Sequence, residues 1–573
     1  MIVEDQSKLI AFLSSPKAYG AEVTRVDRID THCSTVFLAG DCAYKLKRAV
    51  KYDYLDFSTV EKRRTACEAE VRLNRRTAPN LYLGVLAITR EADGKLALGV
   101  PSAAGPPQHA FRAGDPGAAL GAPLDGRGVP VDWLVHMVRF DQDMLLDRLA
   151  VRGALDLELM TPLAAAIARF HASAERRWDQ NGRSGMAWVI EGNASGFAEF
   201  GRDLFSTETC DRLNGLARAA VERLGDHLDV RRNDGFVRVC HGDLHLRNIM
   251  LIDGQPTLFD AVEFDDRIAC IDVLYDLAFL VMDLWRLGLR AHANTLFNAY
   301  LERTNELHAL ALLPLFLSSR SAVRAKTNAT SAKMQADVAK ARELRMAARQ
   351  YLAQAEDFLR PRRPHLVAIG GVSGTGKSEL ARRLAPTIGP TPGAVVLRSD
   401  VIRKSLFGLP TTSRLGPEGY TNTVTEEVYR RLAKRAAEVL EAGHAVIADA
   451  VFGRLEQRIA IAEIARATRV RFVGLWLEAP IEVLTARLGA RRADASDATI
   501  EILRRQLSRD SGPLDWDRID ASGDLDLVER RAAAVLTGAG SGVLTGGNFA
   551  AEPKTASKAL TKKLLHLSAL EDV

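Results

Sequence analysis

Two short segments contain residues whose types and spacing suit the binding and transfer of phosphate groups. The segment His241-Gly-Asp-Leu-His-Leu-Arg-Asn248 places a carboxylate, Asp243, five positions before the amide of Asn248. The segment Gly371-Val-Ser-Gly-Thr-Gly-Lys-Ser378 fits the phosphate-binding pattern G-x-x-x-x-G-K-[ST] at every position. Because the two segments solve the same chemical problem in unrelated ways and lie far apart in the sequence, we predict two nucleotide sites on one chain.

The first half of the chain offers the other residues that such chemistry needs. Transfer of a phosphoryl group from ATP requires a lysine on the phosphates, a carboxylate near the attacking hydroxyl and ligands for Mg²⁺. Lys45 follows an apolar run that predicts a strand, and Glu70, on the next predicted helix, could hold it through an ion pair. Lys47 would lie on the same strand face as Lys45, since side chains alternate with period two. Glu68 similarly competes with Glu70, so we prefer Lys45 and Glu70 but leave both alternatives open.

The loop that begins at His241 resembles the catalytic loop of aminoglycoside phosphotransferases and related protein-kinase-like small-molecule kinases. Leu258-Phe-Asp260 also matches their magnesium-aspartate position, and the resemblance covers roughly residues 30–330. It implies Asp243 as the catalytic base and Lys45 as the lysine that binds ATP. It further implies Asn248 and Asp260 as magnesium ligands, with residues 137–140 near the hinge behind adenine.

The chain departs from that family in two places. No glycine-rich loop of the G-x-G-x-x-G kind precedes Lys45, as is common in the aminoglycoside-kinase branch, and Asp260 is followed by Ala261-Val262-Glu263. Glu263 is then either a further acid beside the metal or a structural residue, and both interpretations stay open.

The second segment has the features of a loop that wraps around phosphates. Its glycines let backbone N–H groups converge on phosphate oxygens, and the helix that follows would add its positive N-terminal end. Lys377 would reach the β and γ phosphates, and Ser378 would ligate Mg²⁺. The residues expected to bind the nucleotide are Gly371, Ser373, Gly374, Thr375, Gly376, Lys377 and Ser378.

Further charged residues follow the strands after this loop. Asp400 and Arg403 lie one helical turn apart, so Asp400 could take a proton from an acceptor hydroxyl while Arg403 holds a charged group. The alternative is that Asp400 only caps a helix. Asp449 ends another apolar strand, either near Mg²⁺ or as an ordinary strand-end residue. Arg487 and Arg491 could act together in a lid over ATP or lie on a solvated helix face.

The C-terminal half also carries a resemblance. Roughly residues 365–535 resemble the P-loop kinase group that includes gluconate kinase and polynucleotide kinase. The order of the two halves resembles bacterial proteins that fuse an aminoglycoside-phosphotransferase-like domain to an ATP-binding kinase domain. That resemblance spans nearly the whole chain and implies ATP and Mg²⁺ as cofactors.

A defined set of elements must position these residues. Residues 36–46 predict a hairpin with a turn at Gly40-Asp41, residues 59–76 a helix, and residues 85–100 a second hairpin. Residues 101–130 are rich in Gly, Pro and Ala and predict a loop. Helical periodicity covers residues 145–174, 197–228 and most of 269–359. Apolar strands are expected at 366–369, 395–397, 445–448 and 472–477.

This order of elements predicts two domains of α/β and α+β class. A protein-kinase-like bilobal domain of the aminoglycoside phosphotransferase type would span 1–360, with a small lobe at about 20–140 and a helical large lobe at about 141–360. A P-loop domain with a parallel sheet would span 361–537, because Pro361-Arg-Arg-Pro364 stops the last helix. Glycine-rich segments predict a flexible tail over 538–573.

Composition excludes several classes of protein. The 573 residues are 47% hydrophobic and 26% charged, which is typical of globular chains, and a net charge of +5 is too small to indicate nucleic-acid binding. The six cysteines lack C-x-x-C spacing and the N-terminus lacks an export signal, so we expect a reducing, cytoplasmic location. The most membrane-like stretch, residues 274–289, contains three charges and predicts a buried or amphipathic helix and no membrane span.

We therefore expect a bifunctional ATP- and Mg²⁺-dependent kinase that phosphorylates hydroxyl groups of small molecules. In one alternative a single domain is active and the other is a nucleotide-binding regulatory module. In another the chain is a nucleic-acid 5′-hydroxyl kinase, which the lack of an aromatic and basic stripe disfavours. A neutral or anionic acceptor is favoured over a cationic aminoglycoside by Arg320, Arg324, Lys326 and Lys333. The oligomeric state stays open.

Overall fold

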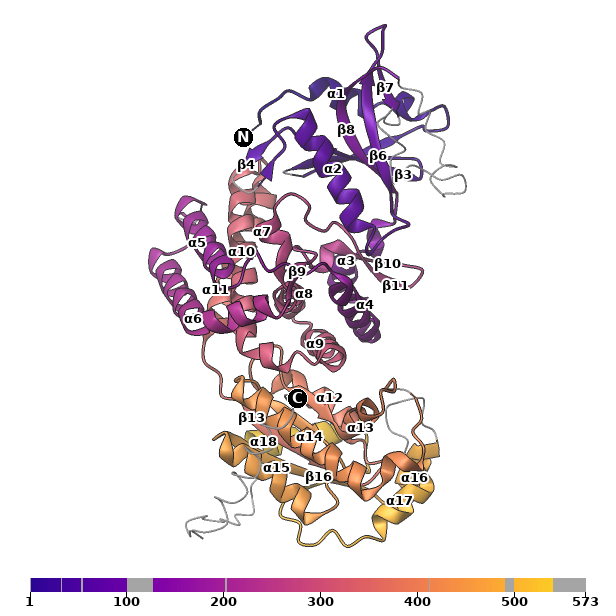
Figure 1. Ribbon diagram of the computed structural model, residues 1–573, viewed down its shortest axis with the longest axis vertical. Coiled ribbons are helices and arrows are strands. Elements are labelled where there is room, and N and C mark those ends of the chain that lie inside the picture. The colour runs from indigo at the N-terminus through magenta and orange to yellow at the C-terminus, as the bar shows by residue number, and fades with distance from the viewer. Residues whose placement is uncertain are drawn as a thin grey trace.

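The chain folds into three regions that follow one another along the longest axis of the molecule, as Figure 1 shows. They are a strand-rich small lobe, a helical large lobe, and an α/β domain formed by the later part of the chain. The computed structural model describes residues 2–31, 33–52, 55–99, 127–200, 203–411, 413–489 and 499–538. The fold class expected from the sequence, a bilobal kinase-like domain followed by a P-loop domain with a parallel sheet, is confirmed. The domain boundaries themselves stay a prediction.

The small lobe is built on a six-stranded antiparallel sheet. Its strand order is β1-β2-β3-β8-β6-β7. The strands are β1 (Val26–Asp30), β2 (Ser34–Ala39), β3 (Cys42–Lys47), β6 (Tyr82–Arg90), β7 (Leu96–Gly99) and β8 (Val129–Val138). The first predicted hairpin is confirmed as β2 and β3, which pair from Ala39 and Cys42 outward across a turn where Gly40 has the left-handed φ of +56°. The second is confirmed as β6 and β7. The loop expected at 101–130 lies mostly outside the described residues.

Both faces of strand β3 are covered, and this determines where its lysines lie. Tyr44 and Leu46 pack with helix α1 (Ser7–Leu13) on one face, and Ala43 packs with helix α2 (Val60–Asn74) on the other. Because side chains alternate along a strand, Lys45 and Lys47 lie on the α2 side with Ala43. The predicted helix over 59–76 is confirmed as α2, whose first turn is capped by the side chain of Thr59.

The large lobe is almost entirely helical. Its helices are α3 (Leu146–Val151), α4 (Met160–Ser173), α5 (Arg183–Phe200), α6 (Thr207–Asn233), α7 (Asp266–Ala269), α8 (Val273–Arg286), α9 (Arg290–Thr304), α10 (Leu313–Met334) and α11 (Val338–Leu359). Two short strand pairs flank the loop of residues 241–248, the predicted catalytic loop. They are β9 (Val237–Val239) with β12 (Cys270–Asp272), and β10 (Ile249–Ile252) with β11 (Gln255–Leu258). Helix α8 is buried from Val273 to Leu284, which confirms the predicted buried helix. Among the described residues, no helix combines the length and apolar character that crossing a membrane requires.

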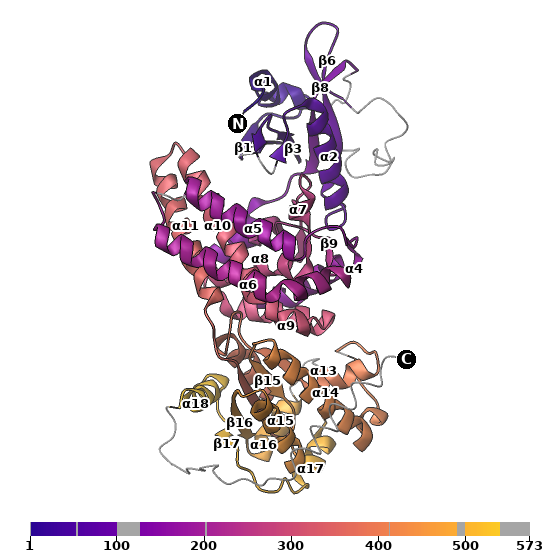
Figure 2. The same cartoon turned by 60° about the vertical axis from the view of Figure 1, so that its left-hand side comes forward.

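The later part of the chain forms a five-stranded parallel sheet flanked by helices (Figure 2). The order is β14 (Val395–Arg398), β15 (Val446–Asp449), β13 (His365–Gly370), β16 (Arg471–Glu478) and β17 (Asp517–Asp520). The helices are α12 (Lys377–Leu384), α13 (Ser399–Leu406), α14 (Asn422–Glu441), α15 (Leu455–Ala467), α16 (Ile481–Gly489), α17 (Ile500–Leu507) and α18 (Leu525–Thr537). Four of the strands were expected from their apolar runs, which central parallel strands need because both faces are buried. The edge strand β17 was not expected, since two aspartates and an arginine interrupt its pattern.

Helix α9 joins the large lobe to this sheet through two asparagines. Asn294 donates from Nδ2 to the carbonyl oxygens of Pro392 and Ala394, both at 3.1 Å. Asn298 donates to Ala394 at 3.1 Å and accepts from the N–H of Val396 at 2.7 Å. The Asn298 amide thus pairs with the outer edge of β14 much as a neighbouring strand would.

Candidate active sites

The predicted catalytic loop, residues 241–248, fixes the orientation of the Asp243 side chain and leaves it partly exposed. The Asp243 side chain is 40% exposed. Asn248 donates from Nδ2 to both Oδ2 and the carbonyl oxygen of Asp243, each at 3.0 Å. His245 Nε2 lies 3.2 Å from the same Oδ2. Because His245 Nδ1 accepts the N–H of Arg247 at 3.2 Å, a neutral ring carries its proton on Nε2 and donates it to Asp243.

The surroundings of Asp243 keep it ionised. Burial raises the pKa of a carboxyl group, but His245, Arg324 and His241 outweigh this effect and hold the pKa of Asp243 below its ordinary value. An ionised and partly exposed carboxylate can orient an acceptor hydroxyl and receive its proton. The structure therefore places Asp243 as the predicted base would require, although its role stays a prediction.

Asp276 on α8 binds the backbone at the start of the predicted catalytic loop. It accepts the N–H groups of His241 and Gly242, both at 3.0 Å, and lies 3.1 Å from Nε2 of the buried His171. Arg320 on α10 donates to the Gly242 carbonyl at 3.1 Å. Gly242 has a φ of +81°, which glycine adopts without strain. The sequence alone does not mark Asp276 as part of the site, because its partners are distant along the chain.

Five charged side chains gather where β3 faces α2. Lys45 Nζ lies 2.8 Å from Glu70 Oε1 and 2.6 Å from Asp260 Oδ1. Lys47 pairs with the other oxygen of Glu70 and with Glu263. Lys45 is 14% exposed and Lys47 only 2%. Lys45 is thus the more exposed of the two lysines and the one that contacts the candidate metal ligand Asp260, and Glu263 takes part in a buried ion pair.

The preference for Glu70 over Glu68 agrees with this arrangement. Glu68 is exposed and pairs with Arg64 on the surface of α2, whereas Glu70 bridges the two lysines. Burial of Glu70 raises its pKa, but the adjacent ammonium groups outweigh that effect and lower the pKa to about 2. Burial likewise lowers the pKa of Lys45, and its acidic neighbours reverse this and raise the pKa well above the ordinary value. Both groups are charged at neutral pH.

Asp260 is held in a left-handed conformation that leaves its carboxylate partly exposed beside Lys45. Its φ is +62° and its side chain is 41% exposed. A left-handed aspartate is uncommon and persists only where neighbours hold it. Its N–H donates to the Tyr82 hydroxyl at 3.0 Å, and the next N–H, of Ala261, donates to Asn74 Oδ1 at 2.8 Å. With Asn248, Asp260 supplies the oxygen donors that Mg²⁺ prefers.

The predicted hinge lies next to this aspartate. The ring of Phe140 packs edge-on against Phe259 with centroids 5.3 Å apart, directly before Asp260. The segment 137–140 therefore ends against the residue that precedes Asp260, while its adenine-binding role stays a prediction.

The phosphate-binding loop of the second domain connects β13 to α12 in the expected strand-loop-helix order. Gly371 has a φ of +134°, and a Cβ there would lie 2.6 Å from the Leu477 carbonyl oxygen, so only glycine fits. Gly374 and Gly376 also have left-handed φ values, of +88° and +89°. Lys377 folds back and donates from Nζ to the Val372 carbonyl at 3.0 Å.

Two other residues of this loop have partners within the protein. Thr375 donates from its hydroxyl to the Val372 carbonyl at 2.9 Å, which tightens the loop. The N–H of Ser373 donates to Oε1 of Gln506 on α17 at 2.7 Å. Gln506, which the sequence analysis did not single out, thus occupies one of the amides expected to bind phosphate.

Ser378 and Asp449 meet at the carboxyl end of the sheet. The Ser378 hydroxyl donates to Asp449 Oδ2 at 2.5 Å. Arg398, at the end of the neighbouring strand, donates from Nη2 to Ser378 Oγ at 3.3 Å. The hydroxyl and carboxylate oxygens form a donor pair that suits Mg²⁺. Arg398 was not identified from the sequence.

Asp400 and Arg403 follow Arg398 within a few positions in the sequence but differ in surroundings. Asp400 is half-buried in the first turn of α13, and the capping position belongs to the residue two before it. Arg403 is buried, donates to the Gly419 carbonyl at 2.6 Å and lies 4.9 Å from the centroid of the Tyr420 ring. The roles predicted for both residues stay predictions.

The predicted lid arginines are only partly described. Arg487 lies in the last turn of α16 and donates to the Gly523 carbonyl at 3.1 Å. Arg491 lies outside the described residues. The lid over ATP therefore stays a prediction.

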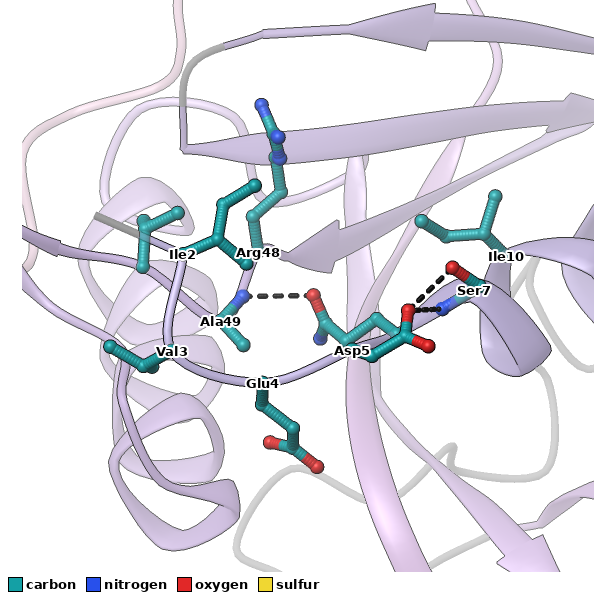
Figure 3. A pocket seen from close by; sticks show the side chains of 10 residues that line it. Ile2, Val3, Glu4, Asp5, Ser7, Ile10, Arg48 and Ala49 are labelled. Atoms are coloured by element: carbon teal, nitrogen blue, oxygen red, sulfur yellow. Dashed lines mark hydrogen bonds between the residues drawn. The ribbon is translucent and has the colours of Figure 1, made fainter.

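A hollow of about 390 Å³ lies elsewhere, between the N-terminal segment 2–7 and the turn after β3. Figure 3 shows Glu4, Asp5 and Ser7 on one side and Arg48 and Ala49 on the other. None of the candidate phosphate-site side chains lines it. We assign it no part in phosphate chemistry.

Comparison with known proteins identifies both halves. Residues 144–313 match the model of the phosphotransferase enzyme family, and residues 366–513 match that of an AAA domain. An uncharacterized protein of Mycobacterium tuberculosis is 30% identical over 515 residues, covering 87% of this chain and 93% of the relative. An adenylyl-sulfate kinase of Myxococcus xanthus is 32% identical over 118 residues, which are 20% of this chain and 59% of that protein.

Two solved structures are also similar. A choline/ethanolamine kinase family protein from Mesorhizobium loti aligns with 62% of this chain and 95% of its own, at 14% identity and a TM-score of 0.37. A gluconokinase from Sinorhizobium meliloti aligns with 31% of this chain and 93% of its own, at 21% identity and a TM-score of 0.24.

The two sites and the two family matches define the class of the molecule: it is a phosphotransferase built from two kinase-type domains. The chain belongs to the family of fused proteins, shared with the mycobacterial relative, in which a phosphotransferase domain precedes a P-loop kinase domain.

Proposed function

We propose that the chain transfers the γ-phosphoryl group of ATP to hydroxyl groups of small molecules at two separate sites. The observation that carries this proposal is that each domain pairs the groups expected to hold Mg²⁺ beside a lysine and a further carboxylate of its motif. In the first domain Asn248 contacts the carboxylate of Asp243, and Lys45 contacts that of Asp260. In the second domain Ser378 contacts Asp449 directly after Lys377, and Asp400 lies in the first turn of the helix that follows the neighbouring strand β14.

The first site would act through residues that the fold already orients. Asp243 accepts the proton of the acceptor hydroxyl as its oxygen bonds to the γ-phosphorus, and the bond from that phosphorus to ADP breaks. Lys45, held by Glu70, neutralises the phosphates. Asn248 and Asp260 would hold Mg²⁺, which supplies positive charge to the phosphate oxygens when bound.

The second site would use different residues for the same steps. The amides of residues 371–376 and the start of α12 would bind phosphate oxygens, and Lys377 would turn from the Val372 carbonyl toward them. Asp400 would accept the acceptor proton. Ser378 and Asp449 fit as the ligands of Mg²⁺.

The acceptors proposed are small and neutral or anionic. The similarity of part of the P-loop domain to an adenylyl-sulfate kinase supports a small-molecule acceptor there. In the first domain Arg324 on α10 lies close enough to lower the pKa of Asp243. Arg320, on the same helix, donates to the Gly242 carbonyl of the predicted catalytic loop. Such positive charge disfavours a cationic acceptor. All six cysteines are free thiols, which supports the proposed cytoplasmic location.

Phosphorylation of a metabolite library by the wild type, Asp243→Asn and Lys377→Ala tests this function. Each variant should lose one set of products and keep the other, and Lys340→Ala on the exposed face of α11 should keep both. A wild-type protein that neither binds ATP nor transfers phosphate would refute the proposal.

A second candidate function makes the P-loop domain a nucleotide-gated regulator of the first. The contact that favours it is the pairing of Asn294 and Asn298 with β14, which links the large lobe to a strand that ends at the second site. In that case Lys377→Ala would change turnover at the Asp243 site, and no acceptor of the P-loop domain would be found.

A further inference from the structure

Arg398 lies against the two oxygens that are expected to hold Mg²⁺ in the P-loop domain. It ends β14, directly opposite Asp449 in the parallel register with β15. Its Nη2 is 3.3 Å from Ser378 Oγ, and its Nε is 3.5 Å from Asp449 Oδ2. The Arg398 side chain is 13% exposed and that of Asp449 is 5%. The carboxylate is therefore already neutralised by a cation of the protein.

The guanidinium contacts the same two atoms, Ser378 Oγ and Asp449 Oδ2, that would ligate Mg²⁺. Like charges a few ångströms apart repel strongly where water is largely excluded. Mg²⁺ bound to these two oxygens would therefore compete with the guanidinium and displace it from them. The Cα of Arg398 is fixed by the pairing of β14 with β15, so only the side chain can move.

The nearest new partners for that side chain are the phosphates. Ser378 directly follows the phosphate-binding Lys377, so a group displaced from Ser378 Oγ starts beside the β and γ positions. The planar fork of arginine suits phosphoryl oxygens, which it can bind with two parallel hydrogen bonds. Arg398 also lies two residues before Asp400, the proposed base, on the same strand-to-helix turn.

We propose that Arg398 is a further substrate-binding residue of the P-loop site, held on Asp449 until Mg²⁺ replaces it and then bonded to the phosphoryl group being transferred. This inference rests on the proposed kinase function of that domain. During transfer the bond from the γ-phosphorus to ADP breaks, its bond to the acceptor oxygen forms, and the acceptor proton passes to Asp400. Arg398 donates N–H bonds to the phosphoryl oxygens throughout and exchanges no proton.

Two measurements on the full chain test the proposal, in a background carrying Asp260→Ala to remove a metal ligand from the first site. A fluorescent ATP analogue is titrated at increasing Mg²⁺, and phosphate release from ATP is followed at saturating Mg²⁺. For Arg398→Met, the Mg²⁺ concentration at half-maximal binding should fall about 5-fold, because the competing cation is gone. Turnover should fall about 100-fold, because a donor to the transferred group is lost.

Control variants separate this role from a structural one. Arg466→Met, an exposed arginine of the same domain, should change neither measurement. Arg398→Lys should keep the Mg²⁺ midpoint near that of the parent and recover only part of the turnover. If Arg398→Met does not fold, Arg398→Gln carries the same two expectations.

An unchanged or raised Mg²⁺ midpoint with intact nucleotide binding overturns the inference alone. It would show that Arg398 only positions Asp449. Failure of the parent protein to bind the analogue at the P-loop would instead refute the proposed function on which the inference rests.

Discussion

Replacing Glu70 with glutamine tests the ion-pair cluster that positions the phosphate-binding lysine. Glu70 is fully buried and its two oxygens contact Lys45 and Lys47 separately. Glutamine keeps the shape and one acceptor oxygen but turns an N–H₂ group toward the other ammonium. One buried lysine then loses its partner in α2, which is costly because the remaining charge stays out of water.

The magnitude follows from the pKa of Glu70. Its lowering from 4.5 to about 2 means that the folded protein stabilises the charged form of Glu70. At 1.36 kcal/mol for each pH unit, the ionised carboxylate contributes about 3 kcal/mol to folding at neutral pH. Because the pKa is lowered on folding, this contribution is fully present above about pH 4.5 and is lost as the pH falls toward 2.

Urea unfolding and amide hydrogen exchange in α2 and β3 measure the effect. Glu70→Gln should destabilise the small lobe by about 3 kcal/mol at pH 7, and the difference from wild type should shrink below pH 4.5. Glu68→Gln is the matched control two positions away, where an exposed pair with Arg64 is worth about 0.5 kcal/mol or less. A loss below about 1 kcal/mol for Glu70→Gln, or a difference that persists unchanged into acid, would refute the reasoning.

Three further predictions concern the two sites and the contact between the domains. Asp243→Asn should slow transfer by the first domain at least 100-fold while ATP affinity stays within about 3-fold, because only the proton acceptor is lost; equal losses in both quantities would contradict this. Lys377→Ala should weaken binding of a fluorescent ATP analogue at the P-loop and leave binding at the first site intact, which titration in an Asp260→Ala background resolves; unchanged P-loop affinity would argue against phosphate contact. Asn298→Leu should speed hydrogen exchange of the Val396 amide about 5- to 100-fold, since its acceptor is removed at a cost of about 1–3 kcal/mol; protection equal to wild type would show that the bond contributes nothing.

The parts of the sites that were predictable are those encoded within a few consecutive residues. The loop of residues 371–378 carries its glycines, its lysine and its hydroxyl in one segment, and the apolar run before it identifies β13. The loop of residues 241–248 likewise contains both Asp243 and Asn248, five positions apart. Because they are so near in the sequence, the two 3.0 Å hydrogen bonds between them form within one loop.

The parts that were missed depend on residues brought together only by folding. Asp276 lies within an apolar helix and contacts amides 34 and 35 positions earlier, so nothing nearby in the sequence marks it. Arg398 reaches Ser378 across 20 positions through the pairing of β14 with β15. Lys45 was preferred over Lys47, but the alternative stayed open because the two share a strand face. Their differing exposure and the contact of Lys45 with Asp260 distinguish them in the folded protein.

The contact between α9 and β14 bears on how the two kinase-type domains can be studied. The outer edge of β14 carries unpaired peptide groups that would favour association with other chains if left bare. Asn298 satisfies one N–H and one carbonyl of that edge, and Asn294 binds two carbonyls just before it. The large lobe thus completes the sheet of the P-loop domain, and the same strand ends at Arg398. Cutting the chain between the domains would uncover this edge next to the second site. The properties of that site should therefore be measured on the full chain.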